Sequence, residues 1–534
     1  MNIRLADNHD LVSYFATRRG RLFILFYVIA TVTLIYSQPV LAQPHFEWVR
    51  NYPMVGQDAA LDSAGNIYIL GRPETNGVSI IKYNPSGSII WTKVQPSVNG
   101  GYLHAASDKY GNLYFTFFDM NDSYFRLTKY DSSGNYQWTK YYVTGGFNTY
   151  PQAIALDTTG NIFLIGNSQT ATGSPFILKY NAQGDLLWTA SSTINRSGFF
   201  AGFVDKPGNI YVTGYCRDSN NYSFDYLTIK FNNAGIQQWA KRYNGPGDDY
   251  DIAVSVKADD EGYCYITGSV AIEGHAGTSG TIKYAPNGDT VWTRLYSLDT
   301  TDQYGGEYLE IDGDGNVYVT GWGHSLTDFQ GEYRTIKYDK YGNLLWIIHD
   351  SNGVYPQSMA IDRNNNIFIT GHNQAYKFYS VGYNYSGIMI WGLLYPPEYI
   401  ASYHGGIKVL IDKNNYLYVY GGSLDSAILL KYSISTGIVN PNQNIVQGYK
   451  LHQNYPNPFN SSTIISYSLP AKGYIHIKIH DLLGKETASL VNENKSAGNY
   501  EVKFEEHNLS TGVYFYTLFV NGQKMDIKKM MVIK

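Results

Sequence analysis

Acidic side chains gather in two stretches of the sequence and could support acid–base chemistry. The two groups are Asp248, Asp249 and Asp251, and then Asp299, Asp302 and Glu307. Paired carboxylates serve as general acid and base in enzymes that cleave glycosidic bonds. Solvated acids in loops are far commoner than catalytic pairs, so the sequence assigns no catalytic residue.

Several aromatic and histidine residues outside the regular pattern of the chain could bind a ligand. Aromatic rings stack against sugars or peptide side chains. Two isolated histidines without a nucleophile or a third ligand are a weak basis for a metal site or for catalysis. The predicted ligand-binding set is Trp322, Tyr304, Tyr333, Tyr222, Asp248, Asp249, Asp251, His275 and His324.

One segment resembles the opening of a calcium loop, with oxygen-bearing side chains at Asp312, Asp314 and Asn316. Gly323 stands at the twelfth position, where such a loop needs Glu. Equivalent segments elsewhere in the chain lack the second Asp, so a structural turn is the favoured interpretation and no metal is predicted.

The sequence leaves one possible disulfide open and contains none of the common cofactor-binding or catalytic motifs. Cys216 and Cys264 could form a disulfide or remain free. No P-loop, dinucleotide fingerprint, serine elbow or zinc-binding helix occurs, so we expect no cofactor and no enzymatic activity.

The composition indicates an all-β protein that does not bind nucleic acid. The 534 residues include 53 Gly and 51 Tyr, and only 16% are charged, with a formal net charge of −4. Glycine turns between aromatic and β-branched runs are typical of strands. This balance excludes a polybasic nucleic-acid binder and a charge-rich disordered chain.

The middle of the chain is one unit written eight times. Each copy begins with an Asp turn of the kind Asp62-Ser-Ala-Gly-Asn-Ile-Tyr68, and the copies start at Asp62, Asp108, Asp157, Asp205, Asp259, Asp312, Asp362 and Asp412. A second signature, such as Lys82-Tyr83 followed by Trp91, comes after each turn. The mean period is about 50 residues, which is typical of propeller blades.

Each unit divides into four short strands. In the fifth unit we expect strands over 252–256, 263–268, 281–284 and 290–296, joined by turns at Asp259 and Ala285. Asp at the start of a turn bonds the backbone ahead of it, and Gly or Asn takes the left-handed position. Asn365 and Asn415 replace that Gly in the last two units, which supports the turns.

The phase of the repeat predicts how the ring closes. The eighth unit has Lys431-Tyr432 but no Trp behind it, and a spare Trp48 precedes the first unit. The N-terminal strand therefore completes the last blade and removes two exposed sheet edges. We predict an eight-bladed β-propeller closed by its N-terminal strand.

Loop lengths distinguish the two faces of the ring. The Asp turn and the Lys–Trp hairpin have constant length, whereas the connections between second and third strands and between units vary. In an antiparallel blade the two kinds of connection lie on opposite rims. Variable loops on a rigid scaffold are common binding sites. The longest loops belong to units four to six, which are the candidate surface.

The repeats resemble the bacterial SBBP-type β-propeller repeat. The likeness is clear in 225–251, where Asp225-Tyr-Leu-Thr-Ile-Lys leads to Trp239 and Gly247. It extends over about residues 45–438 and implies a propeller fold. Such repeats occur in exported and surface proteins without one shared activity.

The N-terminus has the pattern of a secretory signal peptide. Arg18, Arg19 and Arg21 precede an apolar run over 22–36, and Val40-Leu41-Ala42 ends it. Fifteen apolar residues are short of a spanning helix, so cleavage after Ala42 is favoured over a retained anchor. We expect no transmembrane segment in the mature chain. The predicted divisions are signal peptide 1–42, propeller 43–438, linker 439–449 and C-terminal domain 450–534.

The C-terminal segment resembles the type A sorting domain of the type IX secretion system. The motifs that carry the likeness are Asn454-Tyr455-Pro456-Asn457-Pro458-Phe459, Gly512-Val513-Tyr514 and the basic end with Lys528-Lys529. The resemblance implies a small Ig-like β-sandwich that engages the outer-membrane secretion machinery.

Together these features favour a monomeric, exported propeller that binds a surface glycan or a protein. It is exported across the inner and outer membranes and is either secreted or attached to the cell surface. The alternative is a polysaccharide-active lyase or hydrolase that uses the rim carboxylates. A structural spacer without a ligand is a third hypothesis.

Overall fold

The computed structural model describes residues 44–74, 77–96, 100–119, 124–142, 149–168, 174–194, 196–217, 223–247, 249–273, 277–297, 302–325, 331–395, 405–423, 425–434, 450–454, 456–469, 473–482, 484–495, 498–505, 509–520 and 523–533. The predicted signal peptide lies outside these ranges. The described residues form strands and turns without a helix, and none of their segments is a helix that could cross a membrane. The chain separates into two compact units, of which one spans Gln43–Thr436 and the other contains Gly437–Lys534.

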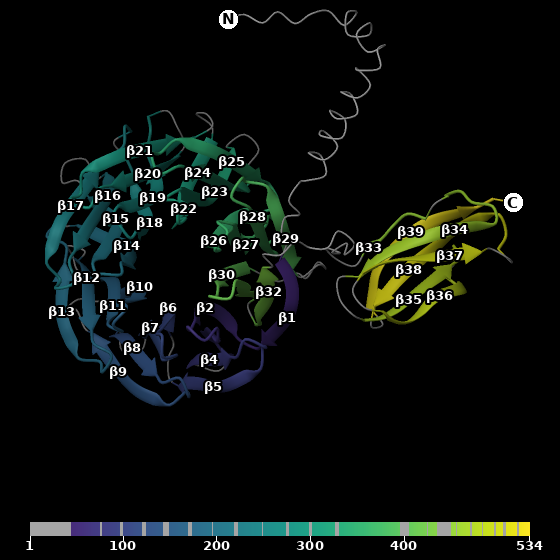
Figure 1. Cartoon of the computed structure of the whole chain (residues 1–534), viewed down its shortest axis with the longest axis horizontal. Helices are drawn as coiled ribbons and strands as arrows, with labels where there is room; N and C mark the ends of the chain where they lie inside the picture. Colours follow the sequence, from purple (N-terminus) through teal and green to yellow (C-terminus); the bar gives the residue numbers. More distant parts are fainter. Residues whose placement is uncertain are drawn as a thin grey trace, which may run out of the picture. The chain divides into compact units, whose positions relative to one another are not determined.

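The larger unit consists of four-stranded antiparallel sheets that follow one another along the chain (Figure 1). The first four are β2 (Val55–Leu61), β3 (Ile67–Arg72), β4 (Gly77–Tyr83), β5 (Ile89–Pro96); β6 (Gly100–Ser107), β7 (Leu113–Asp119), β8 (Tyr124–Tyr130), β9 (Tyr136–Tyr142); β10 (Thr149–Leu156), β11 (Ile162–Ser168), β12 (Ser174–Tyr180), β13 (Leu186–Ser191); and β14 (Ser197–Val204), β15 (Ile210–Arg217), β16 (Phe224–Phe231), β17 (Gln237–Tyr243).

Three further sheets repeat this order, and a fourth combines both ends of the unit. They are β18 (Ile252–Ala258), β19 (Cys264–Val270), β20 (Thr278–Tyr284), β21 (Thr290–Tyr296); β22 (Asp302–Ile311), β23 (Val317–Ser325), β24 (Gly331–Tyr338), β25 (Leu344–Asp350); β26 (Tyr355–Ile361), β27 (Ile367–His372), β28 (Phe378–Tyr383), β29 (Met389–Tyr395); and β30 (Gly405–Ile411), β31 (Tyr416–Gly422), β32 (Ala427–Ile434) with β1 (Pro44–Tyr52). In the fifth unit all four strands overlap their expected ranges; the fourth has the expected bounds, the first and second run two residues further, and the third begins three residues earlier.

Asp turns join the first and second strands of each sheet. Asp62 Oδ1 accepts hydrogen bonds from Ala64 N and Asn66 N, both at 2.9 Å, and Gly65 has φ 83°. Asn365 and Asn415 adopt φ 60° and 64°, which confirms that they take the left-handed position of the missing glycines. The side chain thus replaces backbone partners and sets the length of the turn.

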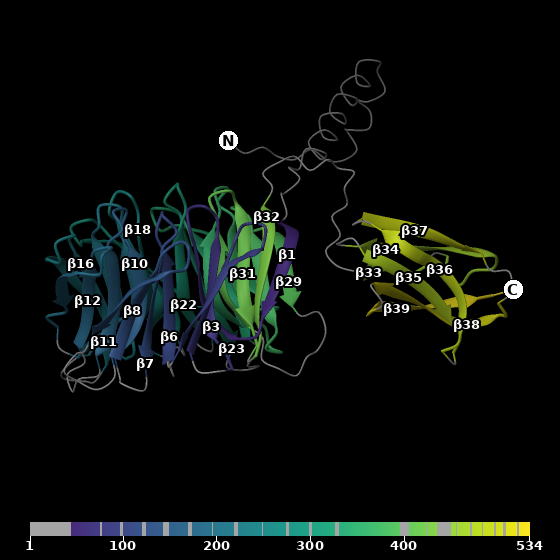
Figure 2. The ribbon, with the colours of Figure 1, turned by 90° about the horizontal axis from the view of Figure 1, so that it is seen from below.

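Consecutive antiparallel strands place alternate connections at opposite ends of a sheet (Figure 2). The Asp turns and the turns between third and fourth strands share one end, which we call the constant rim. The connections between second and third strands and between sheets share the other end, which we call the variable rim. This arrangement agrees with the expectation from loop lengths.

Hydrogen bonds on the constant rim join each sheet to the next. Lys82 Nζ and Trp91 Nε1 both donate to the Ser132 carbonyl oxygen of the following sheet, each at 3.1 Å. Lys283 and Trp292 bond the Lys340 carbonyl in the same way, each at 3.2 Å. The repeated Lys and Trp signatures are therefore contacts between sheets.

The same contact links the last sheet to the first. β1 pairs antiparallel with β32, and Trp48 Nε1 and Lys431 Nζ donate to the Pro85 carbonyl oxygen at 3.3 and 2.6 Å. Tyr420 OH also bonds the Leu70 carbonyl oxygen at 3.0 Å. The innermost strands β2 and β30 lie in contact, as neighbouring innermost strands do elsewhere in the unit.

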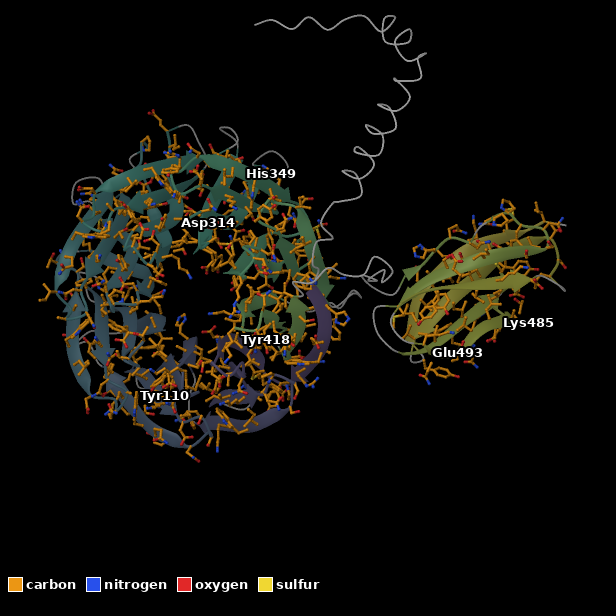
Figure 3. All side chains as sticks on the ribbon, viewed as in Figure 1. Tyr110, Asp314, His349, Tyr418, Lys485 and Glu493 are labelled. Carbon is orange, nitrogen blue, oxygen red and sulfur yellow. The ribbon has the colours of Figure 1, made fainter. Side chains whose placement is uncertain are left out.

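Buried tyrosines and aliphatic residues fill the spaces between adjacent sheets. One cluster combines Ile67 and Ile69 of β3 with Tyr418 and Leu429 of the last sheet, and Tyr418 is labelled in Figure 3. No single sheet can bury both of its faces, so each depends on its neighbours for its core.

The smaller unit contains two sheets around one core. The first has β33 (Lys450–Leu451), β34 (Ser462–Leu469) and β37 (Gly498–Glu505), and the second has β35 (Gly473–His480), β36 (Glu486–Lys495), β38 (Gly512–Val520) and β39 (Gln523–Val532). Ile465, Ile477, Leu518 and Val532 from both sheets are buried together.

Candidate functional site

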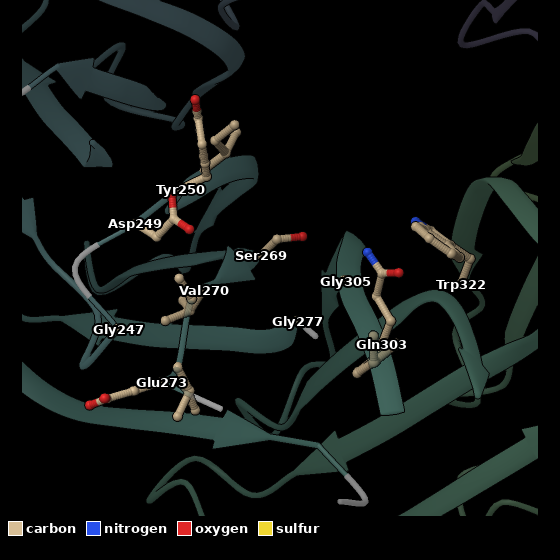
Figure 4. Close-up of a pocket in the computed structure, with 14 residues that line it drawn as sticks. Gly247, Asp249, Tyr250, Ser269, Val270, Glu273, Gly277, Gln303, Gly305 and Trp322 are labelled. Carbon is tan, nitrogen blue, oxygen red and sulfur yellow. The ribbon is translucent and has the colours of Figure 1, made fainter. Parts of the chain in front are cut away.

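A cavity of about 460 Å³ opens on the variable rim, between the sheet that starts with β18 and the sheet that starts with β22. Its lining includes Asp249, Tyr250, Ser269, Glu273, Gln303 and Trp322 (Figure 4). This is the surface that the longest loops indicated. Of the predicted residues, Trp322, Asp249 and Tyr304 line this cavity.

A buried carboxylate holds one wall of the cavity. Asp251 is inaccessible to solvent and accepts hydrogen bonds from the backbone amides of Gly245 and Ala271, the latter at 2.7 Å. Gly247 N also donates to the Ala271 carbonyl at 3.1 Å. The prediction that Asp251 contacts the ligand is therefore wrong, because its carboxylate is used to position the loop.

Backbone contacts hold the opposite wall. Gly277 forms a parallel bridge with Gln303, and Tyr304 N donates to the Gly277 carbonyl at 3.5 Å. Gly305 lies beside them, where an added Cβ would stand 2.6 Å from Ser269 Oγ. The absence of a side chain at Gly305 keeps this part of the cavity open.

Two of the predicted stacking residues, Tyr304 and Tyr333, are buried between sheets. The Tyr304 and Tyr333 side chains are 1% and 0% exposed, and their hydroxyls donate to the Arg334 and Tyr379 carbonyl oxygens at 3.2 and 3.3 Å. The Arg334 guanidinium lies 5.0 Å from the Tyr304 ring centre. The prediction that these rings offer an open stacking face is wrong, because both are packed between sheets.

Trp322 begins a strip of aromatic rings that runs away from the cavity. His324 stacks on Trp322 with ring centres 4.9 Å apart, and Tyr355 lies 5.5 Å from Trp322. His372 follows at 5.1 Å from Tyr355, and Tyr376 lies 5.2 Å from His372. Tyr355 and Tyr376 are 40% and 54% exposed. We call these five residues the Trp322 strip.

A second strip reaches the cavity from the other side. It comprises Phe200, Tyr215, Phe224 and Tyr250, with successive ring centres 5.6, 4.8 and 5.1 Å apart. Tyr250 is 58% exposed and lines the cavity. The Arg217 guanidinium lies 5.7 Å from the Phe224 ring centre. We call these four aromatic residues the Tyr250 strip.

The cavity itself is acidic and rich in hydrogen-bonding groups. Asp249 and Glu273 are its charged lining residues among those described, and both are exposed. Figure 4 shows Ser269 and Gln303 directed toward the space between Asp249 and Trp322, whereas the Glu273 carboxylate is turned away. The arrangement suits a ligand with several hydroxyl or amino groups next to an apolar face.

The remaining predicted residues lie elsewhere. Tyr222, Asp248, His275 and Asp299 are outside the described residues. Glu307 stands at a bulge of β22 and is not part of the cavity lining, and burial raises its pKa to about 7.

Sequence reasoning missed Tyr250, Tyr355 and Tyr376 in the strips, and Ser269 and Gln303 in the cavity. Each lies in a variable-rim connection or close to one. A position in or near a variable-rim loop, the property that selected Trp322, could therefore have identified them as well.

The Asp312 segment is a turn like its counterparts. Asp312 Oδ1 accepts hydrogen bonds from Asp314 N and Asn316 N at 3.0 and 2.9 Å, as Asp62 does in the first unit. Among the residues described here, no group of three or more His, Cys, Asp or Glu side chains is placed to hold a metal. Cys216 and Cys264 are both buried, and burial raises the pKa of the Cys264 thiol.

The sorting motif of the smaller unit is folded against its last strand. The Asn454 amide donates to Thr463 Oγ1 at 3.0 Å, and Asn457 Oδ1 accepts from Met531 N at 2.8 Å. Phe459 is 1% exposed and exchanges backbone hydrogen bonds with Met531 and Ile533. These motif residues determine the fold of the unit. Tyr455 lies outside the described residues.

Elsewhere in the motif, more of the surface remains accessible. Lys529 is exposed on β39, and Lys528 is half-buried 3.4 Å from Asp526. Val513 and Tyr514 are half-buried on β38.

Family models match both parts of the chain. Residues 453–534 match the secretion system C-terminal sorting domain, and residues 137–171 and 347–372 match a β-propeller repeat. The chain thus carries β-propeller repeats and a type IX sorting domain. That domain indicates export by type IX secretion to the cell surface or beyond.

Similar proteins are distant. An uncharacterized WD repeat-containing protein of Acanthamoeba polyphaga mimivirus is 24% identical over 398 residues, a match that covers 53% of this chain and 28% of that protein. A Bacteroides caccae protein of unknown function has a TM-score of 0.32 and 16% identity, over 53% of this chain and 93% of its own. The β-propeller domain of the Trilobed protease of Pyrococcus furiosus has a TM-score of 0.40 and 9% identity, and the match covers 64% of this chain and 97% of that domain.

Proposed function

We propose that this chain is an exported, non-catalytic interaction module in which a closed eight-bladed β-propeller presents a ligand site on its variable rim. Closure is supported by the pairing of β1 with β32 and by the contacts of Trp48 and Lys431 with Pro85 in the first sheet. A closed ring leaves each sheet only short, protected edges and gives its loops a fixed frame.

The observation that carries the binding function is the acidic cavity with exposed aromatic strips on both sides. Large exposed aromatic surfaces on a soluble domain mark interaction sites. The buried Asp251 carboxylate fixes the cavity wall through the Ala271 amide, and the Arg334 guanidinium packs on the buried Tyr304 ring, so the cavity is preorganised.

In the proposed function, the C-terminal unit directs the export of the propeller. In this proposal a signal peptide cleaved after Ala42 brings the chain across the inner membrane, and the C-terminal domain, an Ig-like sandwich, engages the type IX machinery at the outer membrane. The mature protein acts as a monomer, either secreted or attached at the cell surface, where its partner is a glycan or a protein.

A retention assay tests the site. The secreted chain is passed over immobilised xylan, chitin, alginate, lipopolysaccharide and gelatin. We expect retention on at least one of them, and Trp322→Ala or Asp249→Asn should weaken it about tenfold, as expected for a central interface residue. Tyr110→Ala, a 70% exposed tyrosine of a constant-rim turn, is the matched control. Retention on none of them, or retention unchanged in both cavity variants, would refute the proposal.

A second candidate function is polysaccharide cleavage, in which the Asp249 carboxylate of the cavity lining would act as acid or base. In that case the secreted chain should release reducing ends from xylan or alginate, and Asp249→Asn should abolish the release. Binding without turnover supports the module instead.

A further inference from the structure

The two aromatic strips meet at one cavity and together form a track along the variable rim. The Tyr250 strip begins on β14, and the Trp322 strip ends in the connection after β27, so the track crosses four neighbouring sheets. Tyr250 and Trp322 both line the cavity and join the strips to it. A site of this length fits an extended polymer better than a single small molecule.

The chemistry of the track identifies the polymer. A pyranose ring has an apolar face of C–H bonds, which packs on an aromatic ring, and a rim of hydroxyl groups, which bond carboxylates and amides. The strips supply the rings, and Asp249, Ser269 and Gln303 supply the polar partners in the cavity. Burial lowers the pKa of His372 in the Trp322 strip, and the Arg217 guanidinium lies beside Phe224 in the Tyr250 strip.

Charge selects among polysaccharides. The described lining of the cavity contains Asp249 and Glu273 and no Lys, Arg or His. A uronate, sulfate or phosphate group placed there would be repelled by the Asp249 carboxylate, and both partners would lose solvation. Uncharged or amino-substituted sugars meet no such penalty.

The backbone of the cavity disfavours an extended peptide. Recognition by strand addition needs unpaired N–H and C=O groups at a sheet edge. Two pairings already use backbone groups beside the cavity: Phe224 forms a parallel bridge with Tyr250, and Gln303 forms one with Gly277. A peptide would have to displace these pairings, whereas a sugar chain needs only the side chains.

From these observations we propose that the ligand is a polysaccharide of pyranose units without negative charge, bound along the Tyr250 strip, the cavity and the Trp322 strip. This inference rests on the proposed function and adds the class of the partner. The affinity should rise with chain length, because longer oligosaccharides reach more rings.

Calorimetric titration of the secreted chain with xylo- and chito-oligosaccharides of increasing length tests the inference. We expect tighter binding by longer chains of at least one series, and Tyr355→Ala and Tyr376→Ala should each weaken the longest member about tenfold while leaving the shortest nearly unchanged. Both tyrosines are exposed, and unchanged thermal unfolding checks that the variants fold. Tyr110→Ala should match the parent chain.

The outcomes separate the inference from the proposed function. Cavity-dependent binding of alginate, lipopolysaccharide or gelatin, without binding of the two neutral or amino-sugar series, would overturn the inference and leave the interaction module standing. Binding that does not depend on length, or that survives Tyr355→Ala and Tyr376→Ala, would also overturn it. Failure of the cavity variants to affect any binding would refute both.

Discussion

Raising the pH above about 10 should unfold the repeat unit cooperatively, because its core is built from buried tyrosine hydroxyls. Burial is the leading cause that raises the pKa of these residues, and the Asp of the neighbouring turn adds to it for several. Fourteen of them have pKa values raised far above the usual value: Tyr68, Tyr114, Tyr211, Tyr226, Tyr265, Tyr284, Tyr304, Tyr308, Tyr318, Tyr338, Tyr379, Tyr383, Tyr418 and Tyr420.

The sign follows from proton linkage. A tyrosine whose pKa is raised in the folded state stays protonated there and ionises in the unfolded chain, so its stabilisation is complete below about pH 10 and is lost as the pH rises. The loss is about 1.4 kcal/mol per tyrosine at about pH 11. Fourteen such residues lose about 20 kcal/mol, which exceeds the whole stability of a typical domain, roughly 5–15 kcal/mol.

Tyrosinate absorbance and far-ultraviolet circular dichroism, measured together across the pH range, check this prediction. Tyrosinate absorbance that appears before the steep step should leave the β signal intact. The buried tyrosines should then ionise in one steep step that coincides with loss of the β signal. A single gradual titration near pH 10 with an intact β signal would refute the reasoning.

Two substitutions test other contacts. Trp48→Ala removes the half-buried ring that packs on Tyr418 and bonds Pro85, so it should lower the free energy of unfolding by about 2–3 kcal/mol in denaturant titrations, and His45→Ala on the same strand should have little effect. Equal effects would contradict a role for the Trp48 contacts. Phe459→Ala should destabilise the C-terminal unit by about 3–4 kcal/mol in thermal unfolding and reduce the amount of exported chain, with the exposed Leu482→Ala as control. Unchanged thermal unfolding and unchanged export of Phe459→Ala would contradict a structural role for Phe459.

Much of the fold could be predicted from the sequence because the repeat is local. The Asp turn closes over five residues through its own side chain, and the left-handed Asn365 and Asn415 follow from the same rule. The spare Trp48 also indicated the partner of the last sheet, since a missing strand leaves a position that the matching signature can fill.

The variable loop lengths in the sequence predicted the region of the candidate site, but the sequence did not predict which side chains there are accessible. Loop lengths pointed to the rim of units four to six, where the cavity lies. Trp322 and Asp249 line the cavity with accessible side chains, whereas Tyr304 lines it but is buried, Tyr333 is buried, and Asp251 bonds backbone amides. Residue type and spacing cannot separate these cases, because an aromatic or acidic residue near a strand end has the same pattern whether it faces solvent or the next sheet.

By itself, the sequence determined the turns, the strands, their order and the export address, because each depends on residues close together in the chain. The tertiary structure alone decided which side chains share the binding rim. Tyr250, Trp322 and Tyr355 belong to successive sheets. The packing of those sheets places Tyr250 and Trp322 at one cavity and the Tyr355 ring against Trp322. Contacts between sheets depend on how strongly each sheet twists and packs, a property that no single repeat encodes.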